Sequence, residues 1–392
     1  MKRIFALILC LLMVFSLFGC SEKNNQEENG GATVGGEQTN TETGGEDTSA
    51  DNTGSENTAA TVEAFANFKE IFKGKTFLDV YGKQSDPNKH IVKMEDSKMN
   101  WRYVTIDANK KGSTVNILQI SDFHIVNTNA QDLQNPVTAS VFEKHSGSKN
   151  GMGRTQFDEI LKFTSYFDFT VGTGDNADYM HLGALELFKD TIFKLDNVLL
   201  ALGNHDISRM NNGSVADTTT LESRYEILSQ NWAHDVDYTS RVVDNTVMII
   251  QLDNSQSKYY GDQAIKLAAD IEKAKKENLT VLIFQHMPLG VNDVNQSRVT
   301  PIDGGTAQNF QKTYIGGSKY AADTVTAKVY ELITQNADVV KGVFCGHEHE
   351  DFYTEIHGSY TKDGAKVDAI IPQYVLDALH QDSGIALAIT VK

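Results

Sequence analysis

Six short runs of apolar residues recur between residues 115 and 344, and they determine the class of fold. The runs are rich in Val, Ile, Leu and Phe, which is typical of strands in a sheet that is covered on both faces. We predict strands over residues 115–120, 167–171, 197–202, 247–252, 280–284 and 339–344. Apolar residues at helical spacing predict helices over residues 157–167, 185–195, 267–274 and 325–333. Strands that alternate with helices indicate an α/β fold.

Polar residues of the kinds that bind metals follow five of these runs. The segments are S-D-F-H at 121–124, G-T-G-D-N-A-D at 172–178, G-N-H-D at 203–206, Q-H at 285–286 and C-G-H-E-H at 345–349. An open α/β sheet places its binding site at the carboxyl ends of its strands. Each segment alone is more often a turn, a helix cap or a core histidine. Five of them in this order after apolar runs predict one shared site.

The order D-x-H, G-D-x-x-D, G-N-H-D, H and G-H-x-H resembles that of the calcineurin-like metallophosphoesterase family. The resemblance extends from Asp122 to His349, and no position of the family pattern is missing. It implies a four-layer α-β-β-α sandwich, in which two sheets pack face to face with helices outside. It also implies a phosphohydrolase that cleaves phosphomonoesters or phosphodiesters with hydroxide activated by two divalent metal ions.

The resemblance gives each matching residue a role. The ligands of one metal would be Asp122, His124, Asp175 and His349. The ligands of the other would be Asp175, Asn204, His286 and His347, so that Asp175 bridges the two ions. His205 would protonate the leaving oxygen or stabilise the phosphoryl charge, and Asp206 would orient His205. Asp178 would hold a metal ligand by a hydrogen bond.

The residue types also bear on the metal and on the branch of the family. Nitrogen and oxygen ligands without sulfur suit Mn, Fe or Zn more than Ca or Mg. Purple acid phosphatases carry a Tyr three residues after the bridging Asp, where this chain has Asp178, and a non-His residue in place of His124. The chain therefore resembles a non-purple branch, although G-D-N and G-N-H-D resemble sequences related to purple phosphatases. We predict that Cys345 is a small core residue on its strand. For histidines without motif spacing, such as His380, we predict core or surface positions.

The first twenty residues resemble the signal peptide of a bacterial lipoprotein. Lys2 and Arg3 precede an apolar stretch, and L-F-G-C at 17–20 resembles a lipobox. An apolar run of this length with these flanks is typical of a secretion signal rather than a membrane span. Cys20 would carry the lipid and anchor the chain to the membrane on the extracytoplasmic side. An ordinary signal peptide with a chance Cys is the alternative.

The rest of the chain divides by composition. Residues 21–60 are polar and acidic, and they cannot bury enough apolar surface to offset the entropy of ordering. We interpret them as a disordered tether to a metallophosphoesterase domain at 116–392. Residues 61–115 form a flanking region of unknown role, in which residues 101–106 are predicted as a strand.

Charge narrows the choice of partners. Of the formal net charge of −17, the tether carries −8 and Lys2 and Arg3 carry +2, which leaves −11 on residues 61–392. An acidic domain argues against nucleic-acid binding other than as a substrate, so a small phosphoester is the expected ligand and an extracellular nuclease is an alternative. A further alternative is a binding module with structural metals and lost catalysis. The presence of His205, which binds no metal in the family, favours the enzyme.

Overall fold

A computed structural model of the 392-residue chain defines the fold of its carboxyl-terminal part. It describes residues 85–86, 91–92, 97, 99–136, 139–140, 142–143, 150–208, 220–291, 298–299, 308–309, 313–317, 319–381 and 384–392. The expected signal peptide, Cys20, the tether and most of the flanking region before residue 99 lie outside the described residues. Within the ranges given above, no helix is both long enough and apolar enough to span a membrane.

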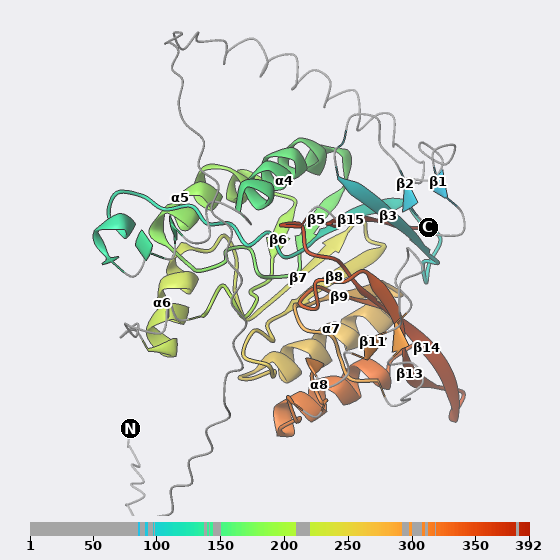
Figure 1. Cartoon of the computed structure of the whole chain (residues 1–392). Helices are drawn as coiled ribbons and strands as arrows, with labels where there is room; N and C mark the ends of the chain where they lie inside the picture. The colour runs from blue at the N-terminus through green and yellow to red at the C-terminus, as the bar shows by residue number, and fades with distance from the viewer. Residues whose placement is uncertain are drawn as a thin grey trace, which may run out of the picture. The chain divides into compact units, whose positions relative to one another are not determined.

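Two mixed β-sheets lie at the centre of the fold (Figure 1). The first has the strand order β1 (Ser85–Asp86), β2 (Ile91–Val92), β3 (Asn100–Ile106), β15 (Ile385–Val391), β4 (Val115–Ile120), β5 (Phe169–Gly172) and β6 (Val198–Leu200). The second has the order β13 (Phe352–Lys362), β14 (Ala365–Val375), β12 (Val340–Cys345), β9 (Thr280–Phe284), β8 (Val247–Leu252) and β7 (Tyr238–Val243). A separate small ribbon pairs β10 (Arg298–Val299) with β11 (Gln308–Asn309).

A buried apolar layer joins the two sheets. Ile117 and Leu387 contribute to it from the first sheet, and Leu282, Phe284 and Phe344 from the second. The rings of Phe284 and Phe344 stack with their centroids 4.9 Å apart. Every residue of β4, β8 and β9 is buried, because the other face of each strand packs against helices. Burial on both faces explains why these strands are almost continuously apolar in sequence.

Helices cover the outer faces of the sheets (Figure 1). On the first sheet these are α4 (Asn150–Phe163), α5 (Leu182–Asp190) and α6 (Leu221–Asn231). The same part of the sequence contains the short 3-10 helices η2 (Asp132–Gln134), η3 (Thr164–Tyr166) and η4 (Ile192–Lys194). On the second sheet they are α7 (Gln263–Glu277) and α8 (Thr324–Thr334). The predicted four-layer α-β-β-α sandwich is therefore confirmed.

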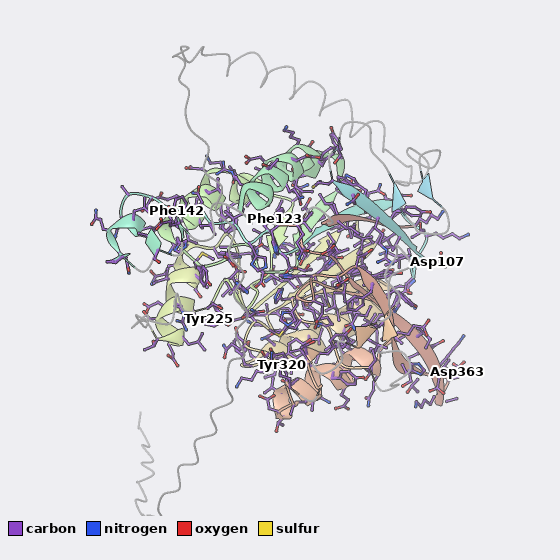
Figure 2. The ribbon with its side chains drawn as sticks, in the orientation of Figure 1. Asp107, Phe123, Phe142, Tyr225, Tyr320 and Asp363 are labelled. Atoms are coloured by element: carbon purple, nitrogen blue, oxygen red, sulfur yellow. The ribbon has the colours of Figure 1, made fainter. Side chains whose placement is uncertain are left out.

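The elements agree with the sequence where the apolar pattern is strong. All six predicted strands form, and β4, β8 and β9 have the predicted bounds. The four predicted helices correspond to α4, α5, α7 and α8. The sequence did not predict α6, β7, β15 or the long hairpin of β13 and β14, whose turn Asp363 marks in Figure 2. Much of the hairpin is exposed, so it lacks the apolar runs that identify the buried strands.

Strand β3 gives a role to part of the flanking region. It pairs in parallel with β15 and so belongs to the first sheet. Its Arg102 forms a buried ion pair with Asp351, with 2.6 Å between Nη1 and Oδ1. Asp351 stands two residues after His349, so β3 supports the loop that carries the last polar segment. Burial raises the pKa of Asp351 to about 6, even though the charge of Arg102 opposes this shift.

Replacing Arg102 with Met should lower the free energy of unfolding by about 3–5 kcal/mol at pH 8, because Asp351 becomes a buried charge without its partner. Loss of Arg102 raises the pKa of the folded carboxyl further above 6. A carboxyl whose pKa is raised in the folded state makes the protein less stable as the pH rises through that pKa. The difference in the free energy of unfolding between the variant and the wild type should therefore be smaller at pH 6 than at pH 8. Urea unfolding of both proteins at the two pH values measures this difference.

The double variant Arg102→Met, Asp351→Asn is the control for the buried charge. It should recover most of the lost stability, because a neutral amide is less costly to bury than an unpaired carboxylate. A double variant as unstable as the single one would show that Arg102 acts through its packing.

Candidate metal centre

The five polar segments meet at one edge of the sandwich. They follow the carboxyl ends of β4, β5, β6, β9 and β12. Hydrogen bonds join their loops: the Asp122 N–H donates to the Gly174 carbonyl, and the Gly346 N–H donates to the His286 carbonyl. Phe123, which Figure 2 labels, stands between Asp122 and His124 in the chain and is buried. Its ring packs edge-on against that of Phe157 of α4, with the ring centroids 5.2 Å apart. The core thus anchors the first loop.

Five of the predicted ligands have left-handed backbone. Their φ angles are 54° at Asp122, 46° at His124, 49° at Asp175, 76° at His347 and 54° at His349. This conformation is uncommon for residues other than Gly and tends to occur at functional sites. In a regular strand, neighbouring side chains point to opposite faces of the sheet. The left-handed residues end this alternation at the positions of the ligands.

Glycines beside the ligands provide room for them. A Cβ on Gly203 would collide with the carboxylate of Asp175. A Cβ on Gly346 would collide with the side chains of Ser121 and Asp122. Gly203 therefore allows two loops of the first sheet to approach closely, and Gly346 allows a loop of the second sheet to approach a loop of the first.

The ligand set expected for the first metal converges. His124 Nε2 lies 3.1 Å from His349 Nε2 and 3.5 Å from Asp175 Oδ2, and His349 Nε2 lies 3.3 Å from Asp122 Oδ1. One ligand atom from each of the four residues lies within 4.8 Å of the others. Atoms that bind one ion at about 2.0–2.2 Å lie roughly 3–3.5 Å from each other. The four side chains therefore fit a single divalent ion.

The second expected set meets around His286. His286 Nε2 lies 3.1 Å from Asn204 Oδ1, 3.3 Å from His347 Nδ1 and 3.3 Å from Asp175 Oδ2. Asp175 Oδ2 is thus close to a histidine of each group, His124 and His286. This is the position that a carboxylate shared by two ions would occupy.

Outer contacts fix two of the imidazole rings. His286 Nδ1 lies 2.8 Å from the carbonyl oxygen of Thr173, and His124 Nδ1 lies 3.2 Å from Asp178 Oδ1. Donation of Nδ1–H to an oxygen leaves Nε2 free to bind a metal, and this arrangement is usual for metal-binding histidines. The Nε2 atoms of both rings face the other ligands.

Opposite charges share the centre. Burial acts to raise the pKa of Asp122 and Asp175, but the surrounding histidines outweigh it and hold both carboxyls below their usual range. Burial acts to lower the pKa of His124, but hydrogen bonds with Asp122 and Asp178 raise it to about 10. Burial and the charge of His286 lower the pKa of His347 to about 3. Metal binding requires neutral imidazoles, so it should release protons from this centre.

His205 lies beside the ligands, but its partner differs from the expected one. Its Nδ1 is 3.0 Å from Asp178 Oδ1, and its side chain is 33% exposed. Asp206 instead is fully buried and accepts hydrogen bonds from the N–H groups of Gly203 and Ala177 and from the Asn176 side chain. The prediction that Asp206 orients His205 is therefore corrected: Asp178 contacts His205, and Asp206 joins two loops.

A segment that carried no motif also reaches the centre. After β14 the chain passes beside the loop at 121–124 that follows β4. The N–H groups of Leu379 and His380 donate there to the carbonyls of Ser121 and Asp122. The His380 ring is buried against His124, and the Gln381 amide lies 3.5 Å from His349 Nδ1. The expectation of a plain core or surface role for His380 misses this proximity. Neither residue has a motif spacing that could have identified it.

The chain is similar to one family of known proteins and to solved structures. A family model for calcineurin-like phosphoesterases matches residues 115–351. The fold is similar to that of a dimetal phosphatase from Danio rerio, at 13% identity and a TM-score of 0.36 over 68% of this chain and 88% of that one. It is also similar to a putative 5'-nucleotidase from Staphylococcus aureus in complex with alpha-ketoglutarate, at 12% identity and a TM-score of 0.34 over 68% and 49% of the two chains.

No curated protein matches the chain. The family match, however, covers more than half of the sequence and includes all five polar segments. The chain therefore belongs to the calcineurin-like phosphoesterase family.

Proposed function

We propose that the protein is a metal-dependent phosphohydrolase that cleaves small phosphomonoesters or phosphodiesters. The observation that carries the proposal is the position of Asp175 between His124 and His286, with the partly exposed side chain of His205 nearby. Two divalent ions in such a centre lower the pKa of water and stabilise charge on the attacking and leaving oxygens of a phosphoester. The nitrogen and oxygen donors favour Mn, Fe or Zn.

The residues of the chain would have separate roles in the reaction. Asp175 and the other ligands would fix the positions of the ions, and Asp178 would orient His124 and His205 together. Because Nδ1 of His205 contacts Asp178, its Nε2 is the nitrogen that would protonate the leaving oxygen. Burial acts to lower the pKa of His205, but the hydrogen bond with Asp178 outweighs it and raises that pKa, which favours the proton-donating form.

The setting of the enzyme is part of the proposal. A lipid on Cys20 would hold the domain at the outer side of the cell membrane. Residues 21–60 would act as a flexible tether that lets the domain move away from the membrane surface. Asp178 and His124, at the positions that distinguish purple acid phosphatases, support a non-purple branch as part of this proposal. The acidic charge of the domain supports small esters over extracellular DNA as substrates.

A panel of phosphoesters tests the proposal. The full chain, loaded with Mn²⁺, should hydrolyse p-nitrophenyl phosphate or bis(p-nitrophenyl) phosphate, and nucleotides and single-stranded DNA complete the panel. Metal content is measured on the same sample. Full occupancy with no cleavage of any ester would favour the binding module with structural metals, and cleavage of DNA alone would favour the nuclease.

A further inference from the structure

His380 lies within the metal centre although it is outside the sequence matched by the family model. The match ends at residue 351, and His380 follows β14. Its ring centroid is 4.4 Å from that of His124 and 4.9 Å from that of His349. One ring nitrogen of each of these three histidines lies within 4.8 Å of the others, which would allow all three to hold a metal ion. The side chain is buried, with 6% of the residue exposed.

The Nδ1 atom of His380 is engaged with the backbone. Its Nδ1 lies 3.2 Å from the carbonyl oxygen of Asp122, which also accepts the His380 backbone N–H at 3.1 Å. Donation of Nδ1–H to a backbone carbonyl leaves Nε2 as the free donor atom. His286, a predicted ligand, makes the same kind of contact to Thr173. Two hydrogen bonds to one carbonyl also restrict the ring to this position.

We propose that His380 is an additional ligand of the first metal position. This inference rests on the metal centre of the proposed function. His124 and His349 belong both to the group with His380 and to the group with Asp122 and Asp175, so His380 would bring a third imidazole to the first metal position. Imidazole ligands suit Zn, Fe and similar ions, whereas Mg and Ca prefer oxygen. The segment 376–381 therefore makes the first position more selective for transition metals than the family pattern alone would.

The competing explanation is that His380 only positions Asp122 through its carbonyl. Two substitutions separate the explanations. In His380→Asn the amide nitrogen can replace Nδ1 and keep the bond to Asp122, but no atom replaces Nε2. In His380→Gln the amide reaches the place of Nε2 and can offer an oxygen to the metal, but the bond from Nδ1 is lost.

Calorimetric titration of the metal-free full chain with Mn²⁺ tests the proposal. The wild type should bind two ions. His380→Asn should weaken the affinity for one of them by at least about tenfold, which is the smallest loss that usually follows mutation of a residue that supports a metal ligand. His380→Gln should bind that ion more tightly than His380→Asn. The visible spectrum of the Co²⁺-loaded protein should also change in His380→Asn, because its bands depend on the ligand set.

His357→Asn is the matched control, because His357 is an exposed histidine on β13 and should leave both affinities unchanged. Wild-type affinity and an unchanged Co²⁺ spectrum in His380→Asn would overturn the proposal. Retained binding in His380→Asn with loss in His380→Gln would also overturn it and assign His380 a positioning role. If the wild type itself fails to bind two ions, the proposed function fails, and this result is distinct from the other two.

Discussion

Replacing His205 with Ala should lower the turnover of a phosphoester by about 10²–10⁴-fold while both metal ions stay bound. His205 contacts Asp178 through Nδ1 and is 33% exposed, so it can reach a bound ester without contributing to either ligand group. The substitution removes a proton donor and leaves the ligands intact. Steady-state kinetics and metal analysis of the same preparation measure the two effects separately.

A matched control for this variant is His357→Ala, which removes an exposed histidine of β13. It should keep both turnover and metal content. Loss of metal from His205→Ala would show that His205 is itself a ligand. Full turnover with full metal content would remove His205 from the reaction.

Asp175→Asn should weaken the binding of both metal ions together. Asp175 Oδ2 lies 3.5 Å from His124 Nε2 and 3.3 Å from His286 Nε2, so one carboxylate serves both groups. An amide has no negative charge to offset the repulsion between two dications. Because Asp175 contacts both groups directly, we expect losses above the roughly 10–100-fold that follow removal of an outer contact. Titration with Mn²⁺ measures both affinities.

Asp253→Asn is the control for this substitution. Asp253 is a fully buried carboxylate that follows β8, the one predicted strand without a metal-binding segment. It should keep two tightly bound ions. Two ions held as tightly by Asp175→Asn as by the wild type would contradict a shared carboxylate.

The sequence predicted those parts of the molecule that depend on local pattern. Strands β4, β8 and β9 are buried on both faces, so each appears as an uninterrupted apolar run with clear ends. The ligands follow such runs directly, and strand direction places them at one edge. The order of the polar segments therefore predicts that they lie together at one edge of the sheets.

Contacts between distant segments could not be predicted in this way. Arg102 and Asp351 are 249 residues apart, and nothing in either surrounding sequence indicates their ion pair. His380 reaches the centre only because the hairpin of β13 and β14 returns the chain to the first loop. Asp206 follows His205 directly in sequence, which suggested a contact, but the turn directs its carboxylate to backbone N–H groups instead.

Parallel titration of bound metal and of turnover tests the central claim most directly. Mn²⁺ is added stepwise to the metal-free full chain, and bound ions and hydrolysis of bis(p-nitrophenyl) phosphate or p-nitrophenyl phosphate are measured at each step. We expect activity to rise as ions bind and to reach its maximum at two ions per chain. Saturation at a single ion, or two bound ions without hydrolysis of either ester, would contradict a dinuclear phosphohydrolase.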